Sequence, residues 1–184
     1  MRTKQEREMI SRARDFAEVA HLGQTRADGK TPYKVHTDFV AMAVVGRVSA
    51  AGEAAAYMHD TKEDTEYKDL SAFPLRVRQL VDLLTRRNDE TKTEMIQRIG
   101  DSGDVEGIMI KVADRIHNLS DKGFGNSWLK KYVKGARHIL KIAVDNGLGA
   151  LDLPQMLQDR IEELEEGSKD EGQRTDRAVA GHGA

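Results

Sequence analysis

Three segments that lie far apart in the sequence carry imidazole or carboxylate groups, namely His36, the doublet His59-Asp60, and Asp114. If the fold brings them together, two histidines and two aspartates form a mixed nitrogen and oxygen pocket that suits a divalent cation. A bound cation can activate water and offset the charge of a phosphate ester, as phosphate hydrolysis at neutral pH requires. We therefore predict that these four residues are the ligands of a metal centre.

Two further carboxylates follow the His-Asp doublet by about one helical turn. We expect residues 53–64 to form one helix, on which Glu63 and Asp64 lie near the faces of His59 and Asp60. A carboxylate so placed can orient a water molecule and take its proton. Glu63 and Asp64 are therefore candidate catalytic groups, and the alternative is that they are solvated charges on a helix surface.

Basic residues lie close to the predicted ligands. The polar loop before His36 carries Arg26, Lys30 and Lys34, and Arg115 directly follows the last ligand. A guanidinium can stack on a base, and either cation can meet a phosphate. Arg115 could reach a phosphate or make a structural salt bridge. These residues are candidates for contacts with an anionic substrate.

The apolar spacing along the chain is helical almost throughout, and no stretch alternates convincingly as a strand. The helices that we expect are 5–21, 37–51, 53–64, 73–86, 91–100, 104–120, 127–146 and 154–166. The predicted fold is an all-α helical bundle that forms one domain over residues 1–166. Apolar residues are almost absent from Gly167 onward, so we expect a disordered tail over 167–184.

Local signals mark several of these boundaries. Thr37 or Asp38 is a plausible N-cap, and Gly52 divides the second and third predicted helices. Thr91 and Glu94 have the spacing of a capping box, in which each side chain satisfies the other residue's backbone amide.

Composition narrows the function classes. The 184 residues include 29 Lys+Arg, 31 Asp+Glu and no cysteine. Balanced charge gives no reason to expect nucleic acid or an anionic membrane as a partner, and the lack of cysteine excludes disulfides and thiolate chemistry. No apolar run approaches the ~20 residues of a membrane span, and the charged N-terminus lacks the apolar core of a secretory signal. We expect a cytoplasmic protein, and the oligomeric state stays open.

Four pieces of the sequence, in order, resemble a known family: AHLGQTRADGKTPYKVH (20–36), MHDTKEDT (58–65), LLT (83–85) and IKVADRIHNL (110–119). In the HD-domain metal-dependent phosphohydrolases, a His, a His-Asp doublet and a later Asp hold one cation. The finer similarity is to the hydrolase domain of the RelA/SpoT alarmone enzymes and to the small stand-alone alarmone hydrolases. A weaker similarity continues through 128–140.

This resemblance implies an HD-domain fold and catalysis by the Glu63-Asp64 pair. It favours Mn²⁺ as the cation, with Zn²⁺, Fe²⁺ or Co²⁺ as alternatives. The implied substrate is a small purine nucleotide, and the implied reaction removes the 3′-pyrophosphate from a guanosine or adenosine tetra- or pentaphosphate. The resemblance also implies that Arg26 contacts the purine, that Asn118 contacts the nucleoside, and that Tyr132 lies at the other end of the substrate.

Two other classes of function stay open. The chain could be a different HD-domain nucleotide phosphohydrolase, acting on a 5′-phosphate, a dNTP, a cyclic dinucleotide or NADPH. It could instead be a catalytically silent module that binds a nucleotide or a partner protein. The base and the number of phosphates also stay open.

Overall fold

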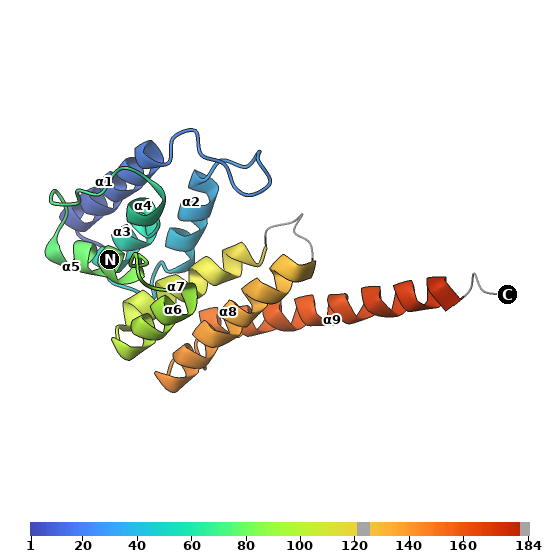
Figure 1. The fold of residues 1–184 in the computed structure, drawn as a ribbon. Coiled ribbons are helices and arrows are strands. Elements are labelled where there is room, and N and C mark those ends of the chain that lie inside the picture. The colour runs from blue at the N-terminus through green and yellow to red at the C-terminus, as the bar shows by residue number, and fades with distance from the viewer. Residues whose placement is uncertain (121–125, 181–184) are drawn as a thin grey trace.

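The protein is described here by a computed structural model that covers the backbone of residues 1–120 and 126–180, and the side chains of residues 1–120 and 131–167. The described helices are α1 (Lys4–Ala20), α2 (Lys34–Ala43), α3 (Ala50–Met58), α4 (Thr61–Asp64), α5 (Leu75–Leu84), α6 (Lys92–Asp101), α7 (Val105–Asn118), α8 (Asn126–Asp145) and α9 (Asp152–Ala180) (Figure 1). Within these ranges there is no strand, and Thr25 and Pro32 form an isolated antiparallel bridge. The prediction of an all-α single domain is confirmed.

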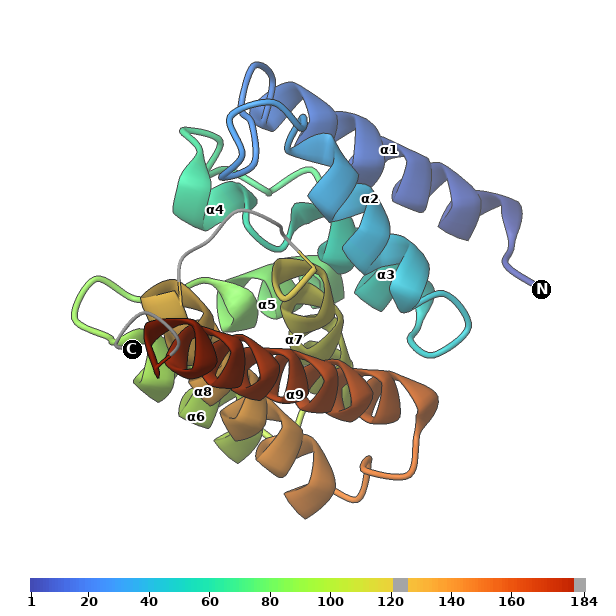
Figure 2. The ribbon, with the colours of Figure 1, turned by 90° about the vertical axis from the view of Figure 1, so that its right-hand side faces the viewer.

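Helix α7 lies at the centre of the bundle and holds the last predicted ligand. It packs against α2, α3 and α5 on one side and against α6, α8 and α9 on another (Figures 1 and 2). Every residue from Gly107 to Ile116 is buried, which fits a helix that is covered on all sides. Asp114 and Arg115 are therefore fixed in the interior by the packing of α7.

Most of the predicted helices are present. The helices α1, α5, α6, α7 and α8 begin and end within two residues of the predicted bounds. The capping box is also confirmed, because Thr91 Oγ1 accepts from the Glu94 amide at 3.2 Å and Glu94 Oε2 accepts from the Thr91 amide at 2.7 Å.

The region from residue 34 to residue 52 differs from the prediction. Helix α2 begins at Lys34 rather than at a cap on Thr37 or Asp38, and it ends at Ala43. Gly52 lies inside α3 and does not divide two helices. A Cβ on Gly52 would lie 2.8 Å from Glu106 Oε1, so the glycine permits close packing of α3 on the start of α7.

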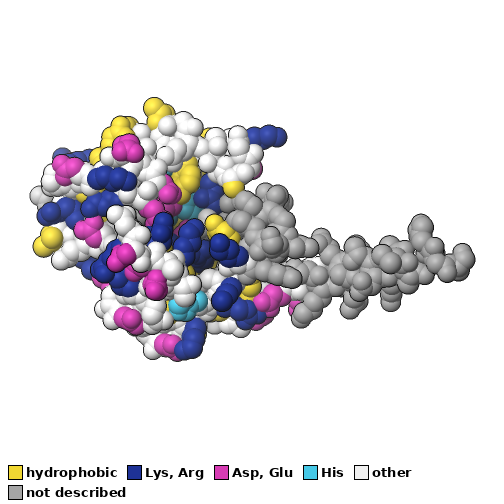
Figure 3. Space-filling model, in the orientation of Figure 1, with side chains coloured by type: hydrophobic (Ala, Val, Ile, Leu, Met, Phe, Trp, Pro, Cys, Tyr) yellow, Lys and Arg dark blue, Asp and Glu magenta, His cyan; other side chains and the backbone are white. Residues whose placement is uncertain are grey.

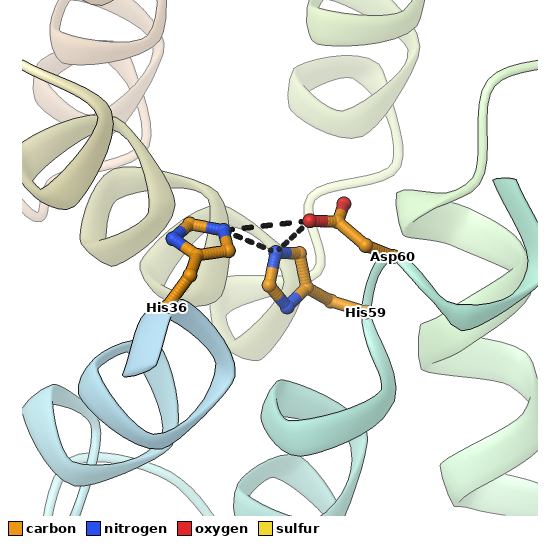
Figure 4. A group of neighbouring side chains, drawn as sticks. All are labelled: His36, His59 and Asp60. Carbon is orange, nitrogen blue, oxygen red and sulfur yellow. Dashed lines mark hydrogen bonds and ion pairs between the residues drawn. The ribbon is translucent and has the colours of Figure 1, made fainter. Parts of the chain in front are cut away.

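The prediction of a single helix over residues 53–64 is wrong. Helix α3 ends at Met58, and α4 begins at Thr61. On a continuous helix, neighbouring side chains diverge by about 100°. The break lets the side chains of His59 and Asp60 turn toward the same point (Figure 4).

The last helix is longer than predicted. The backbone of α9 is helical to Ala180, whereas we expected the helix to end near residue 166. No proline follows Pro154, and the sequence beyond residue 166 contains several good helix formers, such as Glu, Lys, Gln and Arg. Disorder over 167–184 stays a prediction, and residues 181–184 lie outside the described part. None of the described helices is both long and apolar enough to cross a membrane.

Candidate active site

The four predicted ligands converge where α2, the α3–α4 break and α7 meet. Asp60 Oδ2 lies 2.9 Å from His59 Nε2 and 3.4 Å from His36 Nε2. Asp114 Oδ1 lies 3.4 Å from His36 Nε2 and 3.9 Å from His59 Nε2. Figure 4 shows His36 on α2 and the adjacent His59 and Asp60 of the α3–α4 break pointing toward one another. The four side chains therefore lie close together, with His36, His59 and Asp60 as the tightest group, and their role as metal ligands stays a prediction.

Except for the 3.9 Å between His59 and Asp114, these spacings fit a common cation. Two donor atoms that each lie about 2.1 Å from a metal are about 3.0 to 3.4 Å apart at right or tetrahedral angles. In addition, His36 Nε2 and His59 Nε2 face each other at 3.3 Å. Two nitrogen lone pairs at that distance repel each other unless a cation or a proton lies between them. The donor set and its spacing thus suit a divalent metal ion.

The outer nitrogen of each imidazole has a partner that orients the ring. His59 Nδ1 lies 2.9 Å from the Ala56 carbonyl oxygen, which can only accept, so Nδ1 carries the proton and the Nε2 lone pair faces the site. His36 Nδ1 lies 2.9 Å from His117 Nδ1. Such contacts behind a ligand commonly fix the tautomer that binds a metal.

The two aspartates are held from behind. Asp114 receives a hydrogen bond from Asn118 Nδ2 at 2.5 Å and pairs with the buried Lys111 at 2.8 Å. Burial acts to raise the pKa of Asp114, but Lys111 and a hydrogen bond from His36 outweigh it and hold the pKa well below its ordinary value. Asp60 Oδ2 accepts from the Tyr33 hydroxyl at 2.6 Å. Burial and the charge of Asp60 raise the pKa of Tyr33, which keeps this donor protonated.

The candidate catalytic carboxylates line the same cavity. Asp64 Oδ2 lies 3.2 Å from the Tyr33 hydroxyl, so Tyr33 connects Asp64 to the predicted ligand Asp60. Burial, followed by the charges of Asp60 and Glu63, raises the pKa of Asp64. Glu63 accepts from the Arg86 amide at 3.1 Å and from Arg86 Nε at 3.3 Å. Both carboxylates therefore border the site in fixed positions.

Most of the predicted substrate residues also line this cavity, whose volume is about 260 Å³. Arg26 Nη2 donates to Asn118 Oδ1 at 2.7 Å, and the guanidinium lies 5.6 Å from the centre of the Tyr33 ring. The guanidinium of Arg115 lies 5.5 Å from the centre of the Tyr132 ring. These residues add two cation–aromatic pairs to the lining of the cavity.

The prediction that Lys34 contacts the substrate is not supported by its position. Its ammonium group pairs with Glu18 on α1 at 2.7 Å, and Lys34 does not line the cavity. The reason is that α2 starts at Lys34 itself, so His36 and Lys34 point to different sides of the first helical turn.

Four residues of the site escaped the sequence analysis: Tyr33, Lys92, Lys111 and His117. A signal was present for Lys111 and His117, because they precede and follow Asp114 by three residues on a predicted helix. Tyr33 and Lys92 reach the site through contacts between distant segments, and their local sequence does not reveal these contacts.

Comparisons with known proteins agree with this geometry. No family model matches the chain. Over 128 residues it is 29% identical to a guanosine-3′,5′-bis(diphosphate) 3′-pyrophosphohydrolase of Borreliella burgdorferi, covering 62% of the chain and 19% of that protein. Over 145 residues it is 34% identical to a GTP pyrophosphokinase of Streptomyces coelicolor, covering 72% of the chain and 17% of that protein. The chain thus spans about a fifth of the length of these curated relatives.

A solved structure shares the fold. It belongs to a metazoan ortholog of SpoT that is described as hydrolysing ppGpp, and it superposes with a TM-score of 0.70. The sequences are 22% identical, and the match covers 84% of this chain and 94% of the other. In sequence the chain thus resembles the RelA/SpoT proteins that are named as ppGpp hydrolases, and in fold it resembles the SpoT ortholog.

Proposed function

We propose that this protein is a metal-dependent hydrolase that removes pyrophosphate from the 3′ position of guanosine or adenosine tetra- or pentaphosphates. One observation carries the proposal. Two imidazoles and two carboxylates converge at a cavity whose lining also includes guanidinium and ammonium groups. The names of the curated relatives support this choice of substrate.

The cation would be held by His36, His59, Asp60 and Asp114, and we propose Mn²⁺. When bound, it would lower the pKa of water and offset charge on the phosphate oxygens. Mixed imidazole and carboxylate ligands suit manganese, iron or zinc better than a site built for magnesium alone.

The protein's own carboxylates would handle the proton. In the proposed reaction a water oxygen bonds to the phosphorus that carries the 3′ oxygen. The bond between this phosphorus and the 3′ oxygen breaks, pyrophosphate leaves, and the 3′ oxygen takes a proton. The Tyr33 hydroxyl contacts both Asp64 and the proposed ligand Asp60, so Asp64 lies close to the metal site. Asp64 would accept the proton of the attacking water. Glu63, fixed by Arg86, would orient that water.

The purine would lie against Arg26 and Asn118. These two side chains are joined by a hydrogen bond, and the Arg26 guanidinium already lies over an aromatic ring, so it offers its plane for stacking. Arg115 would bind a phosphate, because it lines the cavity. No carboxylate among the described residues lies within 4 Å of its guanidinium.

A turnover screen with added Mn²⁺ tests the proposal. The panel comprises the guanosine and adenosine 3′-pyrophosphorylated nucleotides, a dNTP, a cyclic dinucleotide and NADPH, with the products separated by chromatography. We expect pyrophosphate and an intact 5′-di- or triphosphate from the first group. We also expect Glu63→Gln and Asp64→Asn to keep the metal and lose about 10²- to 10⁴-fold in kcat.

Other outcomes contradict the proposal. Release of orthophosphate from NADPH alone, or of a 5′-phosphate, would assign the site to another phosphohydrolase. Binding of nucleotide without turnover of any panel member would make the protein a silent binding module.

A further inference from the structure

His21, the C-cap residue of α1, is a buried histidine outside the proposed metal site. Little of the coloured surface in Figure 3 belongs to histidine, and His21 itself is only 3% exposed. Its Nε2 is buried and has no hydrogen-bond partner among the described residues. Burial of an unsatisfied nitrogen costs free energy that an apolar side chain of similar size would avoid. Packing alone therefore does not explain an imidazole at this place.

The other ring nitrogen of His21 leads to the candidate catalytic carboxylate. His21 Nδ1 lies 2.8 Å from Gln24 Oε1, and Gln24 Nε2 donates to the backbone carbonyl oxygen of Asp64 at 3.0 Å. Figure 2 shows the segment after α1 beside α4, the helix that ends at Asp64. Because the Asp64 carbonyl can only accept, the amide oxygen of Gln24 faces His21. That oxygen also accepts, so His21 Nδ1 carries a proton and donates it to Gln24.

The same two residues hold Tyr33. The His21 ring stacks on the Tyr33 ring, with 4.5 Å between the ring centres and 14° between the planes. The Tyr33 amide donates to the Gln24 carbonyl oxygen at 3.0 Å. The Tyr33 hydroxyl in turn lies 3.2 Å from Asp64 Oδ2. Asp64 is thus held at its backbone through Gln24 and at its carboxylate through Tyr33, and both supports lead back to His21.

Asp64 needs support from outside its own helix, because α4 is only four residues long. An isolated turn of helix is unstable in water, since ordering several residues gains a single hydrogen bond. The Gln24 amide satisfies the carbonyl oxygen of Asp64 at the end of this turn, where a helix leaves such oxygens free. The position of the Asp64 carboxylate therefore depends on the contacts that α4 receives.

We infer that His21 and Gln24 are positioning residues, which hold Asp64 and Tyr33 where Asp64 can take the proton of the attacking water. This inference rests on the proposed function and adds two residues that do not line the cavity. Proton transfer from water requires an acceptor within hydrogen-bond reach. A small displacement of the carboxylate therefore slows the reaction and leaves the binding of substrate and cation unchanged.

The test measures kcat, KM and Mn²⁺ affinity in the full-length protein with guanosine 5′-diphosphate 3′-diphosphate. Gln24→Met keeps the length of the side chain and removes both of its hydrogen bonds. His21→Phe keeps a ring against Tyr33 and removes the Nδ1 donor. We expect kcat to fall about 10-fold in each variant, while KM and Mn²⁺ affinity stay within about 2-fold of wild type. His21→Asn restores a donor near the position of Nδ1 and should recover most of kcat.

Gln97→Met is the matched control. Gln97 on α6 also lies beside a histidine, with 3.1 Å between its Oε1 and His138 Nε2, and it donates to Asp101 Oδ1 at 2.8 Å. It does not line the cavity. Loss of this second pair should leave kcat within about 2-fold of wild type. An equal loss of kcat in Gln97→Met and Gln24→Met would overturn the inference.

A purely structural role for the pair gives a different result. The kcat per folded molecule would then stay at the wild-type value, or KM and Mn²⁺ affinity would change together with kcat, and either result overturns the inference. Failure of the proposed function shows in the wild type, which would not hydrolyse the nucleotide. Crystal structures of the wild type and Gln24→Met still test the inference in that case. An Asp64 carboxylate that moves beyond about 3.5 Å from the Tyr33 hydroxyl supports it, and an unmoved carboxylate overturns it.

Discussion

The metal site and the surface around Lys131 and Lys134 on α8 are built in opposite ways. At the metal site, the two histidines and Asp114 are buried, and each predicted ligand is held from behind, as Asp114 is by Lys111 and Asn118. Lys131 and Lys134 are exposed and form no ion pair among the described residues. The metal site therefore depends on fixed geometry, whereas this surface depends on summed charge. Substitutions should consequently have large effects at the metal site and graded effects on the surface.

The largest effect is expected at Asp114. In Asp114→Asn the site loses a negative charge, and the buried Lys111 is left to repel a cation. We expect the protein to lose its bound metal and at least about 10³-fold in turnover. Metal content after dialysis and the rate with added Mn²⁺ measure the two losses. Asp38→Asn is the matched control, since Asp38 pairs with Arg14 on the surface. If the Asp114→Asn protein retains a full equivalent of metal, Asp114 is not a ligand.

A smaller effect is expected at His117, which contacts the predicted ligand His36. For His36 to bind a metal through Nε2, its Nδ1 must carry the proton and donate to His117 Nδ1. His117→Leu removes the acceptor, and we expect affinity for Mn²⁺ to fall about 10- to 100-fold. His117→Asn places an amide oxygen near the same point and should recover most of the affinity. Calorimetric titration with Mn²⁺ distinguishes the two variants, and equal affinities would show that His117 only packs.

The smallest effect concerns the loop between α5 and α6. Glu90 pairs with Arg98, whose guanidinium also binds the carbonyl oxygens of Leu83 and Thr85, and the loop leads to Lys92. A hydrogen bond from Arg98 lowers the pKa of Glu90 from 4.5 to about 2. The stabilisation is therefore complete above about pH 4.5 and is lost as the pH falls toward 2.

Glu90→Gln should reduce the free energy of unfolding at pH 7 by about 1 to 2 kcal/mol. Urea denaturation at several pH values between 7 and 3 measures this quantity. We expect the difference from wild type to shrink toward the acid end. A difference that stays constant with pH would mean that the charge of Glu90 does not contribute.

The comparison also shows which parts of the site were predictable. The meeting of His36, His59, Asp60 and Asp114 could be expected from the sequence, because their residue types and order carry the signal. The break between α3 and α4 could not be predicted, because the sequence of residues 53–64 is uniformly helical in character. Contacts such as His36 with His117 depend on how α2 packs on α7. Lys92 on α6 and Lys134 on α8 line one cavity, and no local pattern in the sequence relates these two residues.

The central claim is that two imidazoles and two carboxylates hold one cation, and anomalous X-ray scattering tests it most directly. Crystals of the protein grown with Mn²⁺ should give one strong peak at the manganese edge. The account predicts a peak within about 2.0 to 2.4 Å of His36 Nε2, His59 Nε2 and oxygens of Asp60 and Asp114. No peak among these four side chains, in a crystal that holds manganese elsewhere, would contradict it.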